Sequence, residues 1–127
     1  MKTEDIKSIL SLVDQSTGTE PKFDLPFSIQ LLASMHQSLT KKTKGDIVVA
    51  FGSKTYGSVM GSDGFIVAIE PRSREEVLTG YVATMFGMHL ITDAYFTSDE
   101  LLLPANCLYV LKWDGERIID QVSCFLL

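Results

Sequence analysis

The stretch that decides the fold is Gly80-Tyr-Val-Ala-Thr-Met-Phe-Gly-Met-His-Leu-Ile-Thr-Asp-Ala-Tyr-Phe96, which Asn106-Cys-Leu-Tyr-Val-Leu111 follows after a loop. Its first apolar residues have helical spacing and end at Gly87, where a glycine can stop a helix. Met88–Thr92 and Cys107–Leu111 are short apolar runs of the kind that form strands. We therefore expect a helix, a glycine, a strand, a loop and a second strand, packed for burial and without a catalytic motif.

Upstream of this unit, two further apolar runs are typical of buried strands. Asp46–Phe51 is β-branched and lies between two glycines, and Phe65–Ile69 has the same character. Residues 52–64 include four glycines in thirteen positions, which predicts an exposed loop. Arg74–Phe86 returns to helical spacing and predicts a helix.

Helices are also expected near the N-terminus. Apolar residues at helical spacing predict one helix over Thr3–Gln15, and a second is expected from about Asp24 to a stop at Gly45. Residues 1–20 are predicted to be an N-terminal helix, acting as an arm that docks elsewhere, with a linker. Residues 21–127 are predicted to be one domain.

The C-terminal residues carry the clearest hairpin signal. Asp114-Gly115 lies between the strand at 107–111 and a last strand over Glu116–Phe125. In all we expect an α+β fold with mixed α/β order, about five strands and three helices in a single domain.

Composition narrows the class of partner. The 127 residues carry a formal charge of −5, which repels nucleic-acid phosphates, and we expect no specific nucleic-acid partner. No apolar run approaches the ~18 residues of a membrane span, and no signal peptide is visible. The predicted location on these grounds is the cytoplasm.

The chemistry-bearing residues do not form a known motif. The glycine-rich segment contains Lys54, but a phosphate-binding loop needs its lysine directly after the second glycine, where Ser58 stands. His36 and His89 are interpreted as packed histidines. Cys107 and Cys124 are interpreted as small buried residues, with a disulfide between them left open. We expect no metal, no cofactor and no enzymatic activity.

The order of these features resembles the tailed-bacteriophage major capsid proteins with the Hong Kong 97-like fold, which encapsulin shells share. The resemblance covers roughly Pro26–Leu127. It is carried by the strand Ile47–Phe51, by Thr84–Asp93 with its central glycine, by Leu108–Leu111 and by the closing strand Arg117–Phe125. Its patterns are general, and the long spine helix and extended loop of a full capsid subunit have no counterpart here.

This resemblance implies the axial and peripheral regions of such a subunit and a non-enzymatic role in a virion. We expect a homo-oligomer, or contact with other virion proteins, located in the virion or the host cytoplasm. Apolar and acidic residues of the two predicted loops are the expected contact residues. They are Tyr56, Met60, Tyr95, Phe96, Asp99 and Leu101.

Two other functions remain open. A small acidic module that regulates or inhibits a cellular protein would have the same charge and the same N-terminal helix. A hydrolase would need one of the cysteines beside a histidine.

Overall fold

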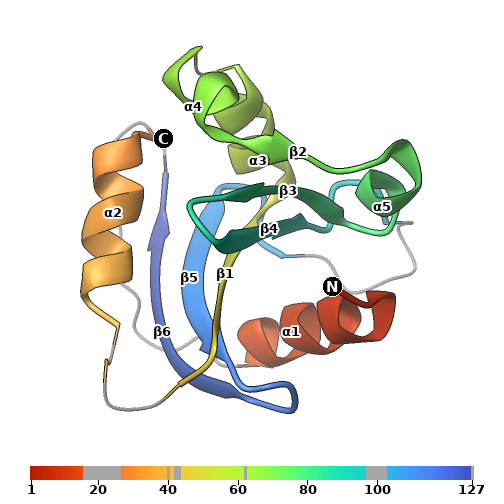
Figure 1. Ribbon diagram of the computed structural model, residues 1–127, viewed down its shortest axis with the longest axis vertical. Helices are drawn as coiled ribbons and strands as arrows, with labels where there is room; N and C mark the ends of the chain where they lie inside the picture. Colours follow the sequence, from red (N-terminus) through yellow and green to blue (C-terminus); the bar gives the residue numbers. More distant parts are fainter. Residues whose placement is uncertain (16–26, 40, 42–43, 62, 97–102, 127) are drawn as a thin grey trace.

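The computed structural model describes residues 1–15, 27–39, 41, 44–61, 63–96 and 103–126 (Figure 1). Within them the chain forms one small α+β domain, a six-stranded sheet flanked by helices, which confirms the predicted fold class. The strands are β1 Asp46–Phe51, β2 Glu70–Pro71, β3 Tyr81–Met85, β4 Met88–Thr92, β5 Cys107–Trp113 and β6 Ile118–Phe125. The helices are α1 Thr3–Gln15, α2 Ile29–Gln37, α3 Ser53–Met60, α4 Asp63–Ala68 and α5 Arg74–Leu78. Among these helices, none combines the length and the apolar character that a bilayer span requires.

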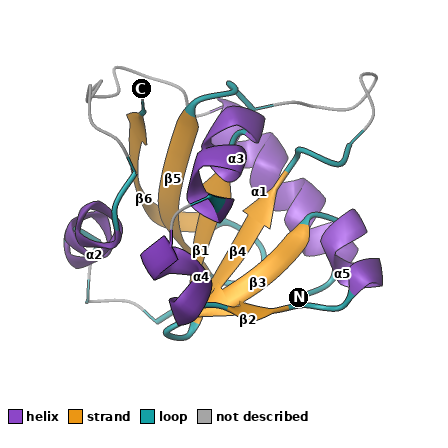
Figure 2. Ribbon diagram, turned by 90° about the horizontal axis from the view of Figure 1, so that it is seen from above, coloured by secondary structure: helices purple, strands orange, loops and turns teal. Residues whose placement is uncertain are grey.

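The sheet has a buried core on each face. Its strand order is β2-β3-β4-β1-β5-β6, with β1 parallel to β4 and every other neighbouring pair antiparallel. Successive side chains of a strand point to opposite faces. Val48 and Ala50 of β1 accordingly pack in the cluster that α1 covers, whereas Val49 and Phe51 pack in the cluster of α2 and α3. Figure 2 shows α1 and α3 on opposite sides of the sheet.

Helix α1 has the predicted bounds, but it is not an arm that docks elsewhere. Its four core residues are each no more than 1% exposed and pack against the sheet: Ile6, Ile9, Leu10 and Val13. Burying a side chain of this size stabilises a fold by roughly 1.5–3 kcal/mol. The helix is therefore part of the domain. The linker predicted over 16–20 lies outside the described residues.

The helix predicted over Arg74–Phe86 is wrong beyond Leu78. Helix α5 ends there, and Gly80 has φ of 100°, a left-handed conformation that redirects the chain into β3. Strand β3 then pairs with β4 in an antiparallel hairpin, with Met85 opposite Met88. The spacing of Val77, Tyr81 and Met85 matched a helix, but residues 81–85 are almost all buried and this short apolar run fits a strand equally well.

The loop predicted over 52–64 and the strand predicted over 65–69 are also wrong. Residues 53–60 form α3 and residues 63–68 form α4. Helix α3 is stabilised from outside its own sequence, because Thr55 and Val59 are buried and its first N–H groups bond to a distant carbonyl, described below. These contacts outweigh the low helix propensity of the glycines.

Helix α2 begins later than predicted. Ser28 is its N-cap, and the Ser28 hydroxyl accepts a hydrogen bond from the Leu31 N–H at 3.0 Å. Leu32 and Met35 pack on the sheet, but His36 is exposed rather than packed. The hairpin of β5 and β6 at Asp114-Gly115 is confirmed, with Trp113 opposite Ile118.

Candidate functional site

Two of the predicted contact residues touch each other. The hydroxyls of Tyr56 and Tyr95 lie 2.7 Å apart, and their rings meet edge to face with centroids 5.7 Å apart. Tyr56 lies on α3, directly after β1, and Tyr95 lies directly after β4. Because β1 and β4 are parallel neighbours, both segments leave the sheet at the same end.

This tyrosine pair forms part of the outer surface. Tyr95 is 42% exposed and Tyr56 is half-buried. Burial, followed by the hydrogen bond to Tyr95, raises the pKa of Tyr56 above its usual value of 10.0. The Tyr56 phenol therefore stays neutral at physiological pH, and the pair offers aromatic carbon together with hydroxyl groups.

Of the other predicted contact residues, Met60 lies one helical turn from Tyr56 on α3, and both pack against the α2 and α3 core. Phe96 is half-buried and packs against the α1 core on the opposite face of the sheet. Asp99 and Leu101 lie outside the described residues. Leu103, at the end of the same loop, is buried in the α1 core.

The sequence reasoning missed three exposed apolar side chains. Val67 is 87% exposed, Phe86 is 77% exposed and Leu78 is 55% exposed. Phe86 lies at the tip of the β3–β4 hairpin, where it has φ of 50° and Gly87 has φ of 79°. An apolar run on each side of Phe86-Gly87 fits two strands joined by a turn, but the helical spacing before Gly87 predicts a glycine-stopped helix instead. Val67 lies in the segment predicted as a buried strand, and the sequence predicts no surface position for Leu78.

The N-terminus of α3 is occupied by the chain itself. The N–H groups of Lys54 and Thr55 both donate to the Ala105 carbonyl, at 2.7 and 3.1 Å. Free N–H groups of this kind are what bind a phosphate at a helix N-terminus. Here the glycine-rich segment instead holds the loop that precedes β5.

The two cysteines lie on opposite faces of the sheet. Both are buried thiols outside any disulfide, Cys107 in the α1 core and Cys124 in the α2 core. Cys124 pairs in register with Leu108, the residue after Cys107. Their side chains therefore point apart, which explains why no disulfide joins them.

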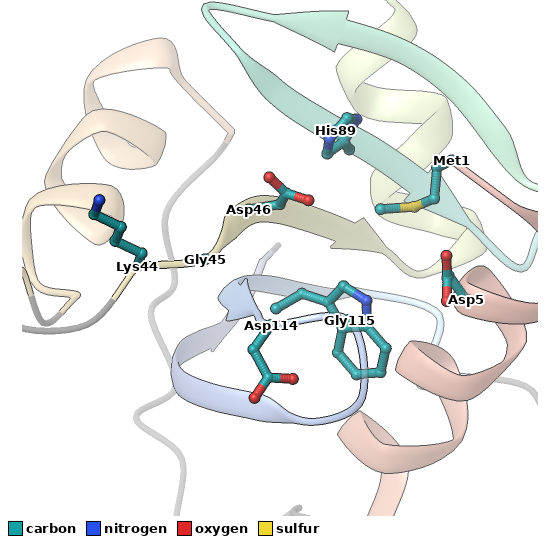
Figure 3. A pocket seen from close by; sticks show the side chains of 9 residues that line it. Met1, Asp5, Lys44, Gly45, Asp46, His89, Asp114 and Gly115 are labelled. Atoms are coloured by element: carbon teal, nitrogen blue, oxygen red, sulfur yellow. The ribbon is translucent and has the colours of Figure 1, made fainter.

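A pocket of about 440 Å³ lies beside the start of β1 (Figure 3). Its lining residues are Met1, Asp5, Lys44, Gly45, Asp46, His89, Trp113, Asp114 and Gly115. Figure 3 shows Asp46 and His89 on the same side of the sheet, with Asp5 reaching in from α1. The carboxylate of Asp114 turns away from them and accepts hydrogen bonds from the N–H groups of Glu116 and Arg117.

His89 in this pocket is held by a tyrosine. Its Nδ1 lies 2.8 Å from the Tyr81 hydroxyl, and the Arg72 guanidinium lies over the Tyr81 ring at 4.7 Å from its centroid. Burial lowers the pKa of His89, although the charge of Asp46 opposes this effect. A neutral, hydrogen-bonded imidazole is the result. Within the described residues, no three His, Cys, Asp or Glu side chains are placed to hold a metal ion.

Comparison of the chain with protein-family models, with curated proteins and with solved structures finds no match.

Proposed function

We propose that this chain is a non-enzymatic structural or capsid-related virion protein, which works by protein–protein contact during assembly. Its partner is a second copy of itself or another virion protein, in the virion or in the host cytoplasm. The observation that carries the contact role is the exposure of two aromatic side chains, those of Phe86 and Tyr95.

Large aromatic side chains exposed to water are unfavourable in an isolated domain and favour contact with another protein. Phe86 and Tyr95 both lie at turns that follow a strand, so rigid strands hold them at the surface. Aromatic residues that become buried on association supply much of the binding energy of protein interfaces. Single exposed apolar residues are common on any protein, so the proposal rests on the aromatic side chains at these turns rather than on their number.

The virion context comes from the sequence resemblance alone. The strands Asp46–Phe51, Met88–Thr92 and Cys107–Trp113 that carry the resemblance lie side by side in the sheet. The helix expected before Gly87 is a strand instead, so this segment departs from the pattern that suggested the family.

Light scattering across a concentration series tests the proposal. The monomer has a mass of 14.1 kDa, and self-association gives a solution mass that rises with concentration to a multiple of that value. A constant monomer mass at all concentrations, with no capture of virion proteins from a phage-infected host, overturns it.

The acidic pocket favours a second function, a small acidic module that binds a cellular protein. Asp5 and Asp46 line this pocket, and within the described residues neither carboxylate has a hydrogen-bond or ion-pair partner. A basic side chain of a partner would pair with them. Pull-down from a host lysate tests this function: loss of a captured protein on Asp5→Asn with Asp46→Asn supports it, and unchanged capture opposes it.

A further inference from the structure

The pocket beside β1 lies between the sheet and the start of helix α1. Asp46 is two residues before Val48, which packs in the α1 core, so both side chains point to the α1 face of the sheet. His89 is level with Val48 in the parallel pairing of β1 and β4 and points to the same face. Asp5 lies in the first turn of α1. Two strands and a helix end therefore direct polar side chains into one space of about 440 Å³.

Two carboxylates in this pocket are without a partner. Within the part of the chain that the structure describes, those of Asp5 and Asp46 take part in no hydrogen bond or ion pair. Figure 3 shows the Asp46 carboxylate turned towards His89 and the Lys44 ammonium turned away from it. The N-terminal ammonium is close enough to act on His89, but it too pairs with neither acid. Both carboxylates are therefore open to a cation from another molecule.

The same pocket holds a buried hydrogen-bond donor. Trp113 is directly opposite Asp46 in the pairing of β1 with β5, and it is 3% exposed. Its indole N–H has no acceptor among the described residues. The indole nitrogen is not one of the polar atoms that are sealed from solvent, so it opens into the pocket that Trp113 lines. A buried tryptophan N–H usually has a partner, and this one favours an acceptor on a ligand.

The acid and the donor are neighbours in the sheet. Residues directly opposite each other in an antiparallel pair have Cβ atoms ~4.5–5.5 Å apart. One small molecule can therefore reach the Asp46 carboxylate and the Trp113 N–H together. A carboxylate binds a protonated amine, and an indole N–H, which can only donate, binds an oxygen acceptor. A ligand that satisfies both carries these two groups close together.

We propose that the pocket beside β1 binds a protonated amine that has an oxygen acceptor on the neighbouring carbon atom. Its ammonium group donates to Asp46, Asp5 adds a second negative charge, and its oxygen accepts from the Trp113 N–H. Free amino alcohols have this pair of groups, and so does the first residue of a polypeptide, whose ammonium group is next to a carbonyl. Pockets of ~300–1,000 Å³ hold drug-sized ligands, so this one has room. The inference rests on the acidic pocket of the second proposed function and names the chemistry that it takes.

The single tryptophan of the chain allows a direct test, because its indole N–H gives one signal in ¹H–¹⁵N NMR spectra. Ethanolamine and glycinamide carry both groups, whereas propylamine lacks the oxygen and propan-1-ol lacks the amine. At constant pH and ionic strength, ethanolamine, glycinamide or both are expected to shift the indole signal to saturation. Propylamine and propan-1-ol are expected to need a roughly tenfold higher concentration for half-saturation. No saturable shift with ethanolamine or glycinamide overturns the proposal, and so does an equal response to propylamine.

The two probes that carry both groups distinguish the sources of the ligand. Tighter binding of ethanolamine assigns the pocket to a free amino alcohol. Tighter binding of glycinamide assigns it to the N-terminus of a polypeptide. Either result supports the shared chemistry.

Asp46→Asn tests the acid, because it keeps the size of the side chain and removes the charge. It is expected to raise the dissociation constant of the tighter probe roughly fivefold, the size of a surface ion pair. Glu75→Gln removes an exposed charge from α5 and is the matched control, with the dissociation constant unchanged. Equal binding by the wild type and Asp46→Asn contradicts the proposal.

Trp113→Phe tests the donor, because it keeps an aromatic ring and removes the N–H. With the Asp46 backbone amide signal as the readout, this variant is expected to bind the tighter probe no better than propylamine. A retained preference contradicts the role of Trp113, and the Asp46→Asn comparison decides the matter if Trp113→Phe does not fold.

This inference and the second proposed function can fail separately. If capture from a host lysate fails while the indole signal responds to the probes, the second function falls and the inference stands. An indole signal that does not respond, with capture intact, overturns the inference alone.

Discussion

Gly52 lies directly against the Pro104 carbonyl, so that a Cβ placed on Gly52 would be 2.0 Å from the Pro104 oxygen. This contact joins the end of β1 to the loop that leads into β5. The Gly52 N–H also donates to the Cys107 carbonyl at 3.1 Å. Gly52, the first glycine of the glycine-rich segment, is therefore a point of close packing between two segments of backbone.

Gly52→Ala is expected to destabilise the domain by about 2–4 kcal/mol, because the added methyl group meets backbone that cannot move alone. Urea denaturation followed by circular dichroism measures this loss. Gly57→Ala, within the α3 helix that follows Gly52, is the control, because a Cβ there meets nothing within 4 Å. That variant is expected to gain about 0.5–1 kcal/mol from the higher helix propensity of alanine. If Gly52→Ala and Gly57→Ala lose similar amounts of stability, close packing against the Pro104 carbonyl is not the reason for the loss at Gly52.

Ser28→Ala is expected to cost about 1 kcal/mol, because it removes the hydroxyl that accepts from the Leu31 N–H at the start of α2. Thermal melting followed by circular dichroism measures the change. Ser34→Ala, at an exposed position within α2, tests serine removal without loss of a cap. It is expected to leave stability unchanged or slightly higher. If Ser34→Ala lowers the melting temperature more than Ser28→Ala does, Ser28 is not a stabilising N-cap of α2.

Asp93 anchors the other end of the loop before β5, since its carboxylate accepts a hydrogen bond from the Leu103 N–H. Asp93→Ala leaves that buried N–H without an acceptor and is expected to cost about 1–3 kcal/mol more than Asp93→Asn at pH 7. Burial raises the pKa of Asp93, although the Leu103 N–H opposes this. Protonation is therefore easier in the folded state than in the unfolded state.

The pH dependence at Asp93 follows from that direction. Between the unfolded pKa of about 3.8 and the raised folded pKa, the folded state binds more protons, so stability falls as pH rises through this window. The wild type should thus gain stability relative to Asp93→Asn as the pH falls from 7 towards 4. Urea midpoints measured in parallel check it. If the wild type instead loses stability relative to Asp93→Asn as the pH falls, the pKa of Asp93 is not raised by folding.

The strands that the sequence predicts correctly share one property. Asp46–Phe51, Met88–Thr92 and Cys107–Leu111 are apolar runs of strand length, and glycine or turn residues mark where they begin or end; the last of these strands continues to Trp113. Local composition is sufficient for such strands. The N-terminal helix is predicted for the same reason, because its apolar residues repeat at one clear period.

The elements that the sequence misses depend on distant contacts. Helix α3 forms in a glycine-rich segment because Ala105, some fifty residues on, bonds its first N–H groups. Strand β3 has a spacing that also fits a helix, and only its pairing with β2 and β4 decides between them. Neither contact is visible in local periodicity.

The candidate contact residues follow the same rule. The sequence predicts Tyr56 and Tyr95 as contact residues independently, each as an aromatic residue in an expected loop, and the parallel pairing of β1 and β4 brings them together. The sequence does not indicate the exposure of Phe86, because this exposure follows from a hairpin turn at a place where the apolar spacing predicts the end of a helix. Whether a side chain is exposed is therefore the property that is hardest to predict from the sequence, since it depends on every element packed around that side chain.

His89 is expected to make stability depend on pH near neutrality. Burial lowers its pKa below the usual 6.5, and the charges of the N-terminus and Arg72 act in the same direction, while Asp46 opposes them. Its Nδ1 lies at the Tyr81 hydroxyl. Below pH 6.5 the unfolded state takes up a proton that the folded state does not, so stability falls as pH drops from 6.5 towards the lower folded pKa.

Thermal melts between pH 5.5 and 8 test this expectation. The wild type should lose melting temperature on acidification, and His89→Gln should lose less, because a glutamine does not titrate. His36→Gln removes the exposed histidine of α2 and is expected to keep the wild-type slope, because His89 is intact. If His36→Gln flattens the slope and His89→Gln does not, the proton uptake belongs to the helix and not to the pocket beside β1.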